Sequence, residues 1–139
     1  MSGQSSIELE FADGSYIFKL PLAQIHELQR KCAEDSGVPS GIGAIFARVL
    51  KGCIQVGSEV MLRPDSAEFF VTDVIETIRQ ALIGGGEGVV NGQPVKVTPA
   101  VANRLVQTYV LERPLAESWS VAAAILGACV VGYDPPKKD

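Results

Sequence analysis

The residues of this sequence best suited to catalysis or metal binding are its single histidine and its three cysteines. His26 is the only histidine that could act as the base of a nucleophilic triad, and no Gly-x-Ser-x-Gly turn accompanies it. Cys32, Cys53 and Cys129 are widely spaced, and no two of these four residues have the short spacing typical of structural zinc sites. We therefore predict no catalytic residue, no metal site, no cofactor and no enzyme activity.

Two glycine-rich segments could in principle bind a phosphate group. The run Gly84-Gly85-Gly86-Glu87-Gly88 follows a predicted helix instead of a strand, and it lacks the Lys-Ser/Thr pair of a nucleotide-binding loop. Gly41-Ile42-Gly43 fails as a dinucleotide fingerprint because Phe46 stands where the third glycine would be. The first run is therefore interpreted as a helix end with a hinge.

The clustered charges allow both a structural and a functional interpretation. Asp73 and Glu76 lie on one side of a predicted helix, and Arg79 is placed to pair with Glu76, which favours a solvated, ion-paired face. Glu112 and Arg113 flank a proline, where they could either cap helix ends or bind an acidic partner. The sequence leaves these two roles open.

Length and composition exclude several classes of protein. The chain has 139 residues, of which 47% are hydrophobic, so we expect one folded domain spanning residues 1–139, with flexible tails at 1–5 and 134–139. The net charge is -4 and no basic run occurs, which argues against nucleic acid as a partner. The most apolar stretch, 121–133, is too short to span a membrane. With an odd number of cysteines and no export signal, the protein is expected in the cytoplasm of its bacterial host.

The N-terminal residues predict a β-hairpin over about 7–20. Apolar and acidic residues alternate from Ile7 to Phe11, and Asp13-Gly14 suits a tight two-residue turn. That turn would place Phe11 opposite Tyr16, Leu9 opposite Phe18 and Ile7 opposite Leu20. One side of the hairpin would then be apolar and would need helices to cover it.

The rest of the chain is predicted to be mainly helical. Five helices are expected: from Pro21 to about Asp35, from Gly41 to Leu50, from Thr72 to the glycines at 84–86, from Thr98-Pro99 to Pro114, and beyond Pro114. The first would bury Leu22, Ile25, Leu28 and Cys32. Residues 53–64 suggest a short second ribbon around Gly57-Ser58, and 87–97 suggest a flexible connection with an Asn91-Gly92 turn. The predicted fold is therefore α+β, mainly α, with the hairpin packed on a bundle of about five helices.

Three segments together resemble a known family: 72–86 (TDVIETIRQALIGGG), 105–110 (LVQTYV) and 112–117 (ERPLAE). The chain is similar to the tail-assembly family of gene transfer agents and related prophages over roughly residues 7–132. Such proteins begin with a short ribbon and continue with a helix like 22–32, the IRxxLIGGG helix and the Arg-Pro-Leu helix pair. This chain has longer segments at 38–68 and 87–97 than that pattern.

The resemblance implies a function in tail morphogenesis. Similar proteins are tail assembly chaperones, which are encoded with the tail tube and tape measure proteins and are thought to keep the tape measure soluble. The leading hypothesis is thus a chaperone that binds the tape measure protein in an apolar groove between the third, fourth and fifth helices. The alternative is a structural tail (tube) component that forms a homo-oligomer through its hairpin edge or its small-residue last helix. The expected protein-binding residues are Arg79, Leu82, Ile83, Gly84, Gly85, Gly86, Tyr109, Arg113, Pro114 and Leu115.

Overall fold

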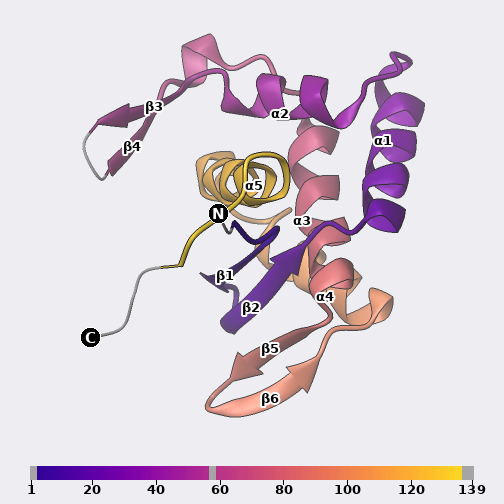
Figure 1. The fold of residues 1–139 in the computed structure, drawn as a ribbon, viewed down its shortest axis with the longest axis vertical. Coiled ribbons are helices and arrows are strands. Elements are labelled where there is room, and N and C mark those ends of the chain that lie inside the picture. Colours follow the sequence, from indigo (N-terminus) through magenta and orange to yellow (C-terminus); the bar gives the residue numbers. More distant parts are fainter. Residues whose placement is uncertain (1–2, 57–58, 136–139) are drawn as a thin grey trace.

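A computed structural model describes residues 3–56 and 59–135 of the chain. In these residues it has five α-helices, six β-strands and one 3-10 turn, Pro64–Ser66 (Figure 1). The helices are α1 (Leu22–Ser36), α2 (Ile42–Leu50), α3 (Val71–Gly85), α4 (Pro99–Tyr109) and α5 (Leu115–Val130). The strands are β1 (Ser6–Phe11), β2 (Gly14–Lys19), β3 (Cys53–Val56), β4 (Glu59–Leu62), β5 (Glu87–Val90) and β6 (Gln93–Lys96).

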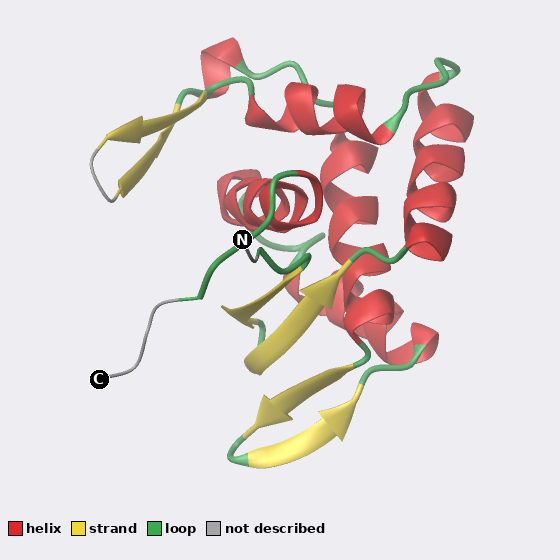
Figure 2. Cartoon of the chain, in the orientation of Figure 1, coloured by secondary structure: helices red, strands yellow, loops and turns green. Residues whose placement is uncertain are grey.

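The prediction of a single hairpin on a mainly helical bundle is wrong. Four strands form one antiparallel sheet in the order β1-β2-β5-β6, and β3 and β4 form a separate ribbon. Helices α3 and α5 contact β2 and β1 (Figure 2), and Ile7, Tyr16 and Phe18 of these strands are buried. The fold is a mixed α+β arrangement in which the sheet is a full layer.

The N-terminal hairpin has the predicted apolar face but a different register. Phe11 lies opposite Gly14, Leu9 opposite Tyr16 and Ile7 opposite Phe18, so the turn residues are Ala12 and Asp13. Gly14 lies in β2, where it allows β5 to approach closely: a Cβ on Gly14 would lie 2.2 Å from the backbone oxygen of Val89 in β5. The shift is two residues, which keeps each side chain on its predicted face.

The connection at 87–97 is an ordered hairpin, which corrects the prediction of a flexible segment. Asn91 and Gly92 have φ values of 52° and 76°, as the predicted two-residue turn requires. β5 joins the sheet through Gly88, opposite Tyr16. A Cβ on Gly88 would lie 2.5 Å from the Tyr16 ring, so glycine lets the two strands approach.

Helix ends follow local sequence signals. α1 ends at Gly37, which has a φ of 75°, and α3 ends at Gly86, which has a φ of 72°. The Thr98 hydroxyl accepts a hydrogen bond from the Val101 N–H at 3.2 Å, which confirms the predicted start of α4. The predicted cap Thr72 lies inside α3, and the Asp73 carboxylate accepts instead from the Phe70 N–H at 2.9 Å.

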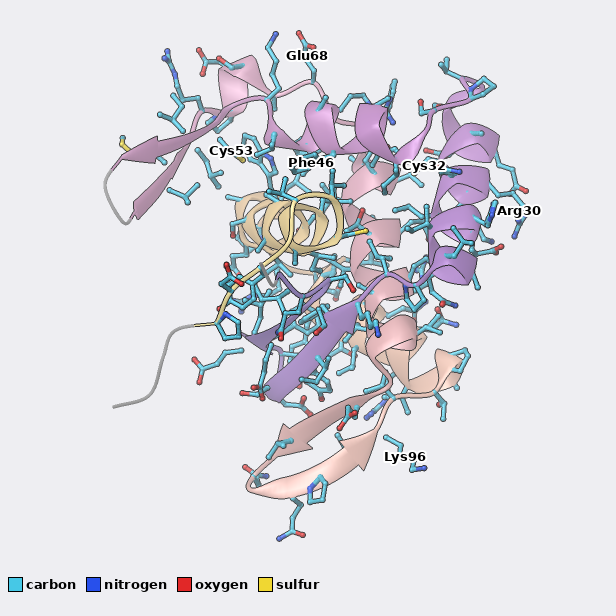
Figure 3. The ribbon with its side chains drawn as sticks, viewed as in Figure 1. Arg30, Cys32, Phe46, Cys53, Glu68 and Lys96 are labelled. Atoms are coloured by element: carbon cyan, nitrogen blue, oxygen red, sulfur yellow. The ribbon has the colours of Figure 1, made fainter. Side chains whose placement is uncertain are left out.

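Helix α3 lies at the centre of the molecule and contacts α1, α4, α5 and β2. α2 packs across α5, and the Trp119 indole N–H of α5 donates to the Val49 backbone oxygen of α2 at 2.7 Å. Phe46 and Cys53 point from α2 and β3 toward α5 (Figure 3). Leu22, predicted to face the core, is instead 71% exposed because it lies in the first turn of α1.

The β3–β4 ribbon projects away from the helices (Figure 1). Its strands were predicted, but the Gly57-Ser58 turn lies outside the described residues. Parts of the tails predicted at 1–5 and 134–139 also lie outside the described residues. Gln4, in the first tail, forms an isolated β-bridge with Tyr133, just before the second. No helix in the described part of the chain is both long and apolar enough to cross a membrane.

Candidate protein-interaction surface

The predicted binding residues at the end of α3 are largely interior. Leu82 is fully buried, and a Cβ on Gly84 would lie 2.1 Å from the Lys19 backbone oxygen. A Cβ on Gly85 would lie 1.8 Å from the Ile17 backbone oxygen. The two glycines therefore bring α3 against β2, and Gly86 ends the helix. Their place in the fold gives them a packing role.

Arg79 and Ile83 are half-buried on α3. Arg79 forms the predicted ion pair with Glu76, whose other oxygen accepts from the Gln80 amide at 3.3 Å. Glu76 is buried, so this pair does not form the solvated face that the sequence suggested. Burial lowers the pKa of Arg79, and its Nε has no hydrogen-bond partner among the described residues.

Asp73 belongs to a different ion pair, which the sequence analysis missed. Its carboxylate is fully buried and accepts two hydrogen bonds of 2.8 Å from Arg48 of α2. Arg48 also donates to the Ser40 hydroxyl at 2.9 Å and lies over the Phe70 ring. The pair joins α2 to α3 across 25 residues of sequence, and no local spacing rule could have revealed it.

The three thiols are poor nucleophiles, and His26 lies on the surface. Burial raises the pKa of Cys32 to about 12, with Asp73 as the next cause. Burial also raises the pKa values of Cys53 and Cys129, so all three thiols are protonated near neutral pH and are weak nucleophiles. His26 lies exposed on α1. No group of three His, Cys, Asp or Glu side chains within the described ranges could hold a metal ion.

The other predicted binding residues lie at the break between α4 and α5. Tyr109 and Arg113 line a cleft of about 360 Å³ beside the tip of the N-terminal hairpin. Arg113 and Glu117 form an exposed ion pair at 3.2 Å, and Leu115 is exposed beside it. The lining residues are Glu10, Phe11, Ala12, Tyr109, Arg113, Glu117, Ser118 and Val121. This cleft is mixed in polarity, unlike the apolar groove that was predicted.

The inward side chains of α3, α4 and α5, between which the apolar groove was predicted, are buried. α3 packs against both α4 and α5. The buried side chains include Ile78, Leu82, Leu105, Val106 and Leu126. These particular side chains belong to the core and are covered by neighbouring elements.

The most exposed apolar cluster on a strand lies on the β3–β4 ribbon. Ile54, Val60 and Met61 are 40%, 53% and 57% exposed. Ile54 and Met61 face each other across the ribbon, while Cys53 and Leu62 at its base are partly buried against the core. A two-stranded ribbon is marginal alone, and its exposed apolar residues favour a protein contact. Sequence analysis located the ribbon but could not show which side chains it leaves uncovered.

Comparison with known protein families adds the family identity. Residues 4–132 match the family described as "Phage tail tube protein, GTA-gp10". No curated protein and no solved structure matches the chain. The family match covers nearly the whole chain and confirms the resemblance to tail proteins of gene transfer agents and prophages. The chain therefore belongs to the phage tail tube protein family GTA-gp10.

Proposed function

We propose that this protein is a structural component of a phage-like tail, assembled in the cytoplasm of the bacterial host, and that it binds other tail proteins. The family description names a tail tube protein, which is a structural role and not an enzymatic one. The observation that carries the proposal is the projecting ribbon with Ile54, Val60 and Met61 exposed. A solitary ribbon with apolar side chains on both faces gains stability when a neighbouring protein covers it.

The composition of mature particles tests this proposal. Particles purified from a producing strain are analysed by quantitative mass spectrometry, with the major tail protein as the internal reference. A structural component should be present in many copies per tail and should stay after washing at high salt. Its absence from intact tails would overturn the structural role.

A second candidate function is a tail assembly chaperone for the tape measure protein. Leu111 and Leu115 are exposed on either side of Pro114, next to the cleft lined by Tyr109 and Arg113. The exposed leucines are suited to bind the apolar face of an amphipathic helix, and the polar residues of the cleft are suited to bind its polar side chains. A long helical partner would supply such a helix. Of the predicted binding residues, Tyr109, Arg113, Pro114 and Leu115 would make this contact.

Co-expression separates this role from the first. The tape measure protein is produced with the wild-type chain, with Leu111→Lys/Leu115→Lys, or with the matched control Val38→Lys, which changes an exposed residue elsewhere. A chaperone should raise the soluble fraction of the tape measure protein, and only the double variant should lose that effect. Equal solubility with and without the wild-type chain would rule out the chaperone role.

A further inference from the structure

Two hollows flank the turn of the N-terminal hairpin. One is the cleft of about 360 Å³ between this turn and the α4–α5 break. The other lies beside the β5–β6 turn and is lined in part by Ser15 and Val89. These two residues are paired across β2 and β5, so both hairpin turns lie at the same end of the sheet (Figure 1). Glu10, Phe11 and Ala12 line both hollows and form a ridge between them, the hairpin ridge.

The hairpin ridge carries a carboxylate that lacks a cationic partner. The Glu10 side chain is exposed and forms no ion pair within the part of the chain that the structure describes. Arg113 is the only basic residue among the described ones that line either hollow, and it donates two hydrogen bonds of 3.2 Å to Glu117. Two glutamates and one arginine give the combined lining a net charge of -1. Glu10 is therefore the uncompensated charge of this surface.

Apolar and aromatic side chains surround the Glu10 carboxylate. Phe11, Tyr109 and Val121 line the cleft with it. The Phe11 ring packs edge-on against Tyr16 with 6.2 Å between the ring centroids, and the Tyr16 hydroxyl donates to the Asp13 carboxylate at 2.6 Å. These contacts fix the hairpin ridge, so a ligand meets a preformed surface and little conformational entropy is lost on binding.

The unpaired carboxylate limits the chemistry of any partner that covers the hairpin ridge. Such a partner removes water from Glu10, and a carboxylate that loses water without gaining a cation or a hydrogen-bond donor costs free energy. A purely apolar surface fits this site poorly, and an acidic one is repelled. A lysine or arginine side chain supplies the missing charge, and its aliphatic stem can lie against Ala12 and Val121. The rings of Phe11 and Tyr109 add a cation–π attraction.

We propose that the cleft beside the hairpin ridge binds a lysine or arginine side chain of another tail protein, and that Glu10 pairs with this side chain. Leu111 and Leu115 are exposed next to the cleft and would contact apolar residues of the same segment. The bound segment is therefore amphipathic, with a basic residue beside its apolar face. This inference rests on the proposal that the chain binds other tail proteins, and it names the chemistry of the segment that is bound.

Binding of synthetic peptides to the purified full-length chain tests this pairing. The probe is a soluble helical peptide with leucines on one face and a single arginine beside them. Matched peptides carry citrulline, which has nearly the same shape as arginine but no charge, or glutamate at that position. Isothermal titration calorimetry should give a Kd at least about tenfold lower for the arginine peptide than for the citrulline peptide, with the glutamate peptide weakest. Equal affinities, or no binding of the arginine peptide, would overturn the proposal.

Variants of the chain assign the effect to Glu10. Glu10→Gln should weaken binding of the arginine peptide by about tenfold and remove its advantage over the citrulline peptide. Glu8→Gln is the matched control, because Glu8 is an exposed glutamate of the same strand and is not among the described residues that line the hollows. An arginine advantage that persists in Glu10→Gln, or that Glu8→Gln removes equally, would contradict the assignment.

A charge exchange gives the converse test. Glu10→Arg, if folded by circular dichroism, should bind the glutamate peptide more tightly than the arginine peptide. The absence of this reversal would refute direct contact between residue 10 and the bound charge. Because these measurements use the purified chain and synthetic peptides, their failure is separable from absence of the protein from mature tails, which would refute the structural role alone.

Discussion

At the scale of single residues, the buried ion pair between Arg48 and Asp73 joins α2 to α3 through two hydrogen bonds. Asp73 is fully buried, and its two oxygens are occupied by one guanidinium. Removing one partner of a buried pair leaves an uncompensated charge, whereas an exposed pair is screened by water. The pair therefore matters for stability far more than the surface pairs do.

We expect Arg48→Leu to lower the free energy of unfolding by about 3 kcal/mol, because the buried Asp73 carboxylate would lose the partner that compensates its charge. Urea unfolding followed by circular dichroism measures the change. The double variant Arg48→Leu/Asp73→Leu should recover much of the loss. The control is Arg30→Leu, which breaks only exposed pairs with Glu27 and Glu34 and should have a much smaller effect. Similar losses for Arg48→Leu and Arg30→Leu would contradict this account.

The thiol of Cys32 should make stability depend on alkaline pH. Its pKa is raised to about 12 in the folded chain, whereas the unfolded chain has an ordinary thiol. The folded state therefore holds this proton more tightly, and the associated stability is lost as pH rises above the ordinary thiol value.

Between about pH 8 and about pH 10, the free energy of unfolding should fall more for the wild type than for Cys32→Ala. Denaturant titrations at a series of pH values give the two slopes. Tyr16, whose pKa burial raises to about 12, is present in both proteins, so its contribution cancels in the comparison of the two slopes. Parallel slopes for the two proteins would show that Cys32 is not responsible.

At the scale of elements, the glycines at the end of α3 set the distance between helix and sheet. Gly84 and Gly85 are in contact with the backbone oxygens of Lys19 and Ile17, so any side chain would separate α3 from β2. The sequence correctly predicted a helix end here, confirmed by Gly86. It could not show that the two preceding glycines pack against a strand 60 or more residues earlier, because that contact is tertiary.

We expect Gly85→Ala to destabilise the fold by about 2 kcal/mol, because the new methyl group overlaps the Ile17 carbonyl. Thermal unfolding measures the effect. Gly127→Ala in α5 is the matched control, since a Cβ there meets no atom within 4 Å and alanine favours the helix. A Gly85→Ala variant as stable as Gly127→Ala would mean that the close approach is unimportant.

The helices were the most predictable elements, because caps such as Thr98 and breakers such as Pro114 act locally. The strands at 87–97 were missed, because each has only four residues and the strand that joins β5 to the sheet, β2, is far away in sequence. The register of the first hairpin was wrong because contact with β5, and not the turn preference of Asp13-Gly14, decides the place of Gly14. Tertiary contacts override local turn preference in this region.

At the scale of the whole molecule, the candidate surface was only partly predictable. The residues at the α4–α5 break are exposed, but Leu82 and the α3 glycines are interior. Exposure depends on which faces the neighbouring elements cover, and a sequence pattern does not fix those neighbours. The side chains that the β3–β4 ribbon leaves uncovered could be identified only from the structure.

The proposed structural role depends on the exposed β3–β4 ribbon, through which the chain would contact other tail proteins. The most direct measurement is electron microscopy of particles from a strain lacking the chain, complemented by Ile54→Lys/Met61→Lys or by the control Val38→Lys, an equally exposed loop variant. The ribbon variant, although folded, should give few complete tails, while the control should restore them. Normal numbers of complete tails with the ribbon variant would contradict the account.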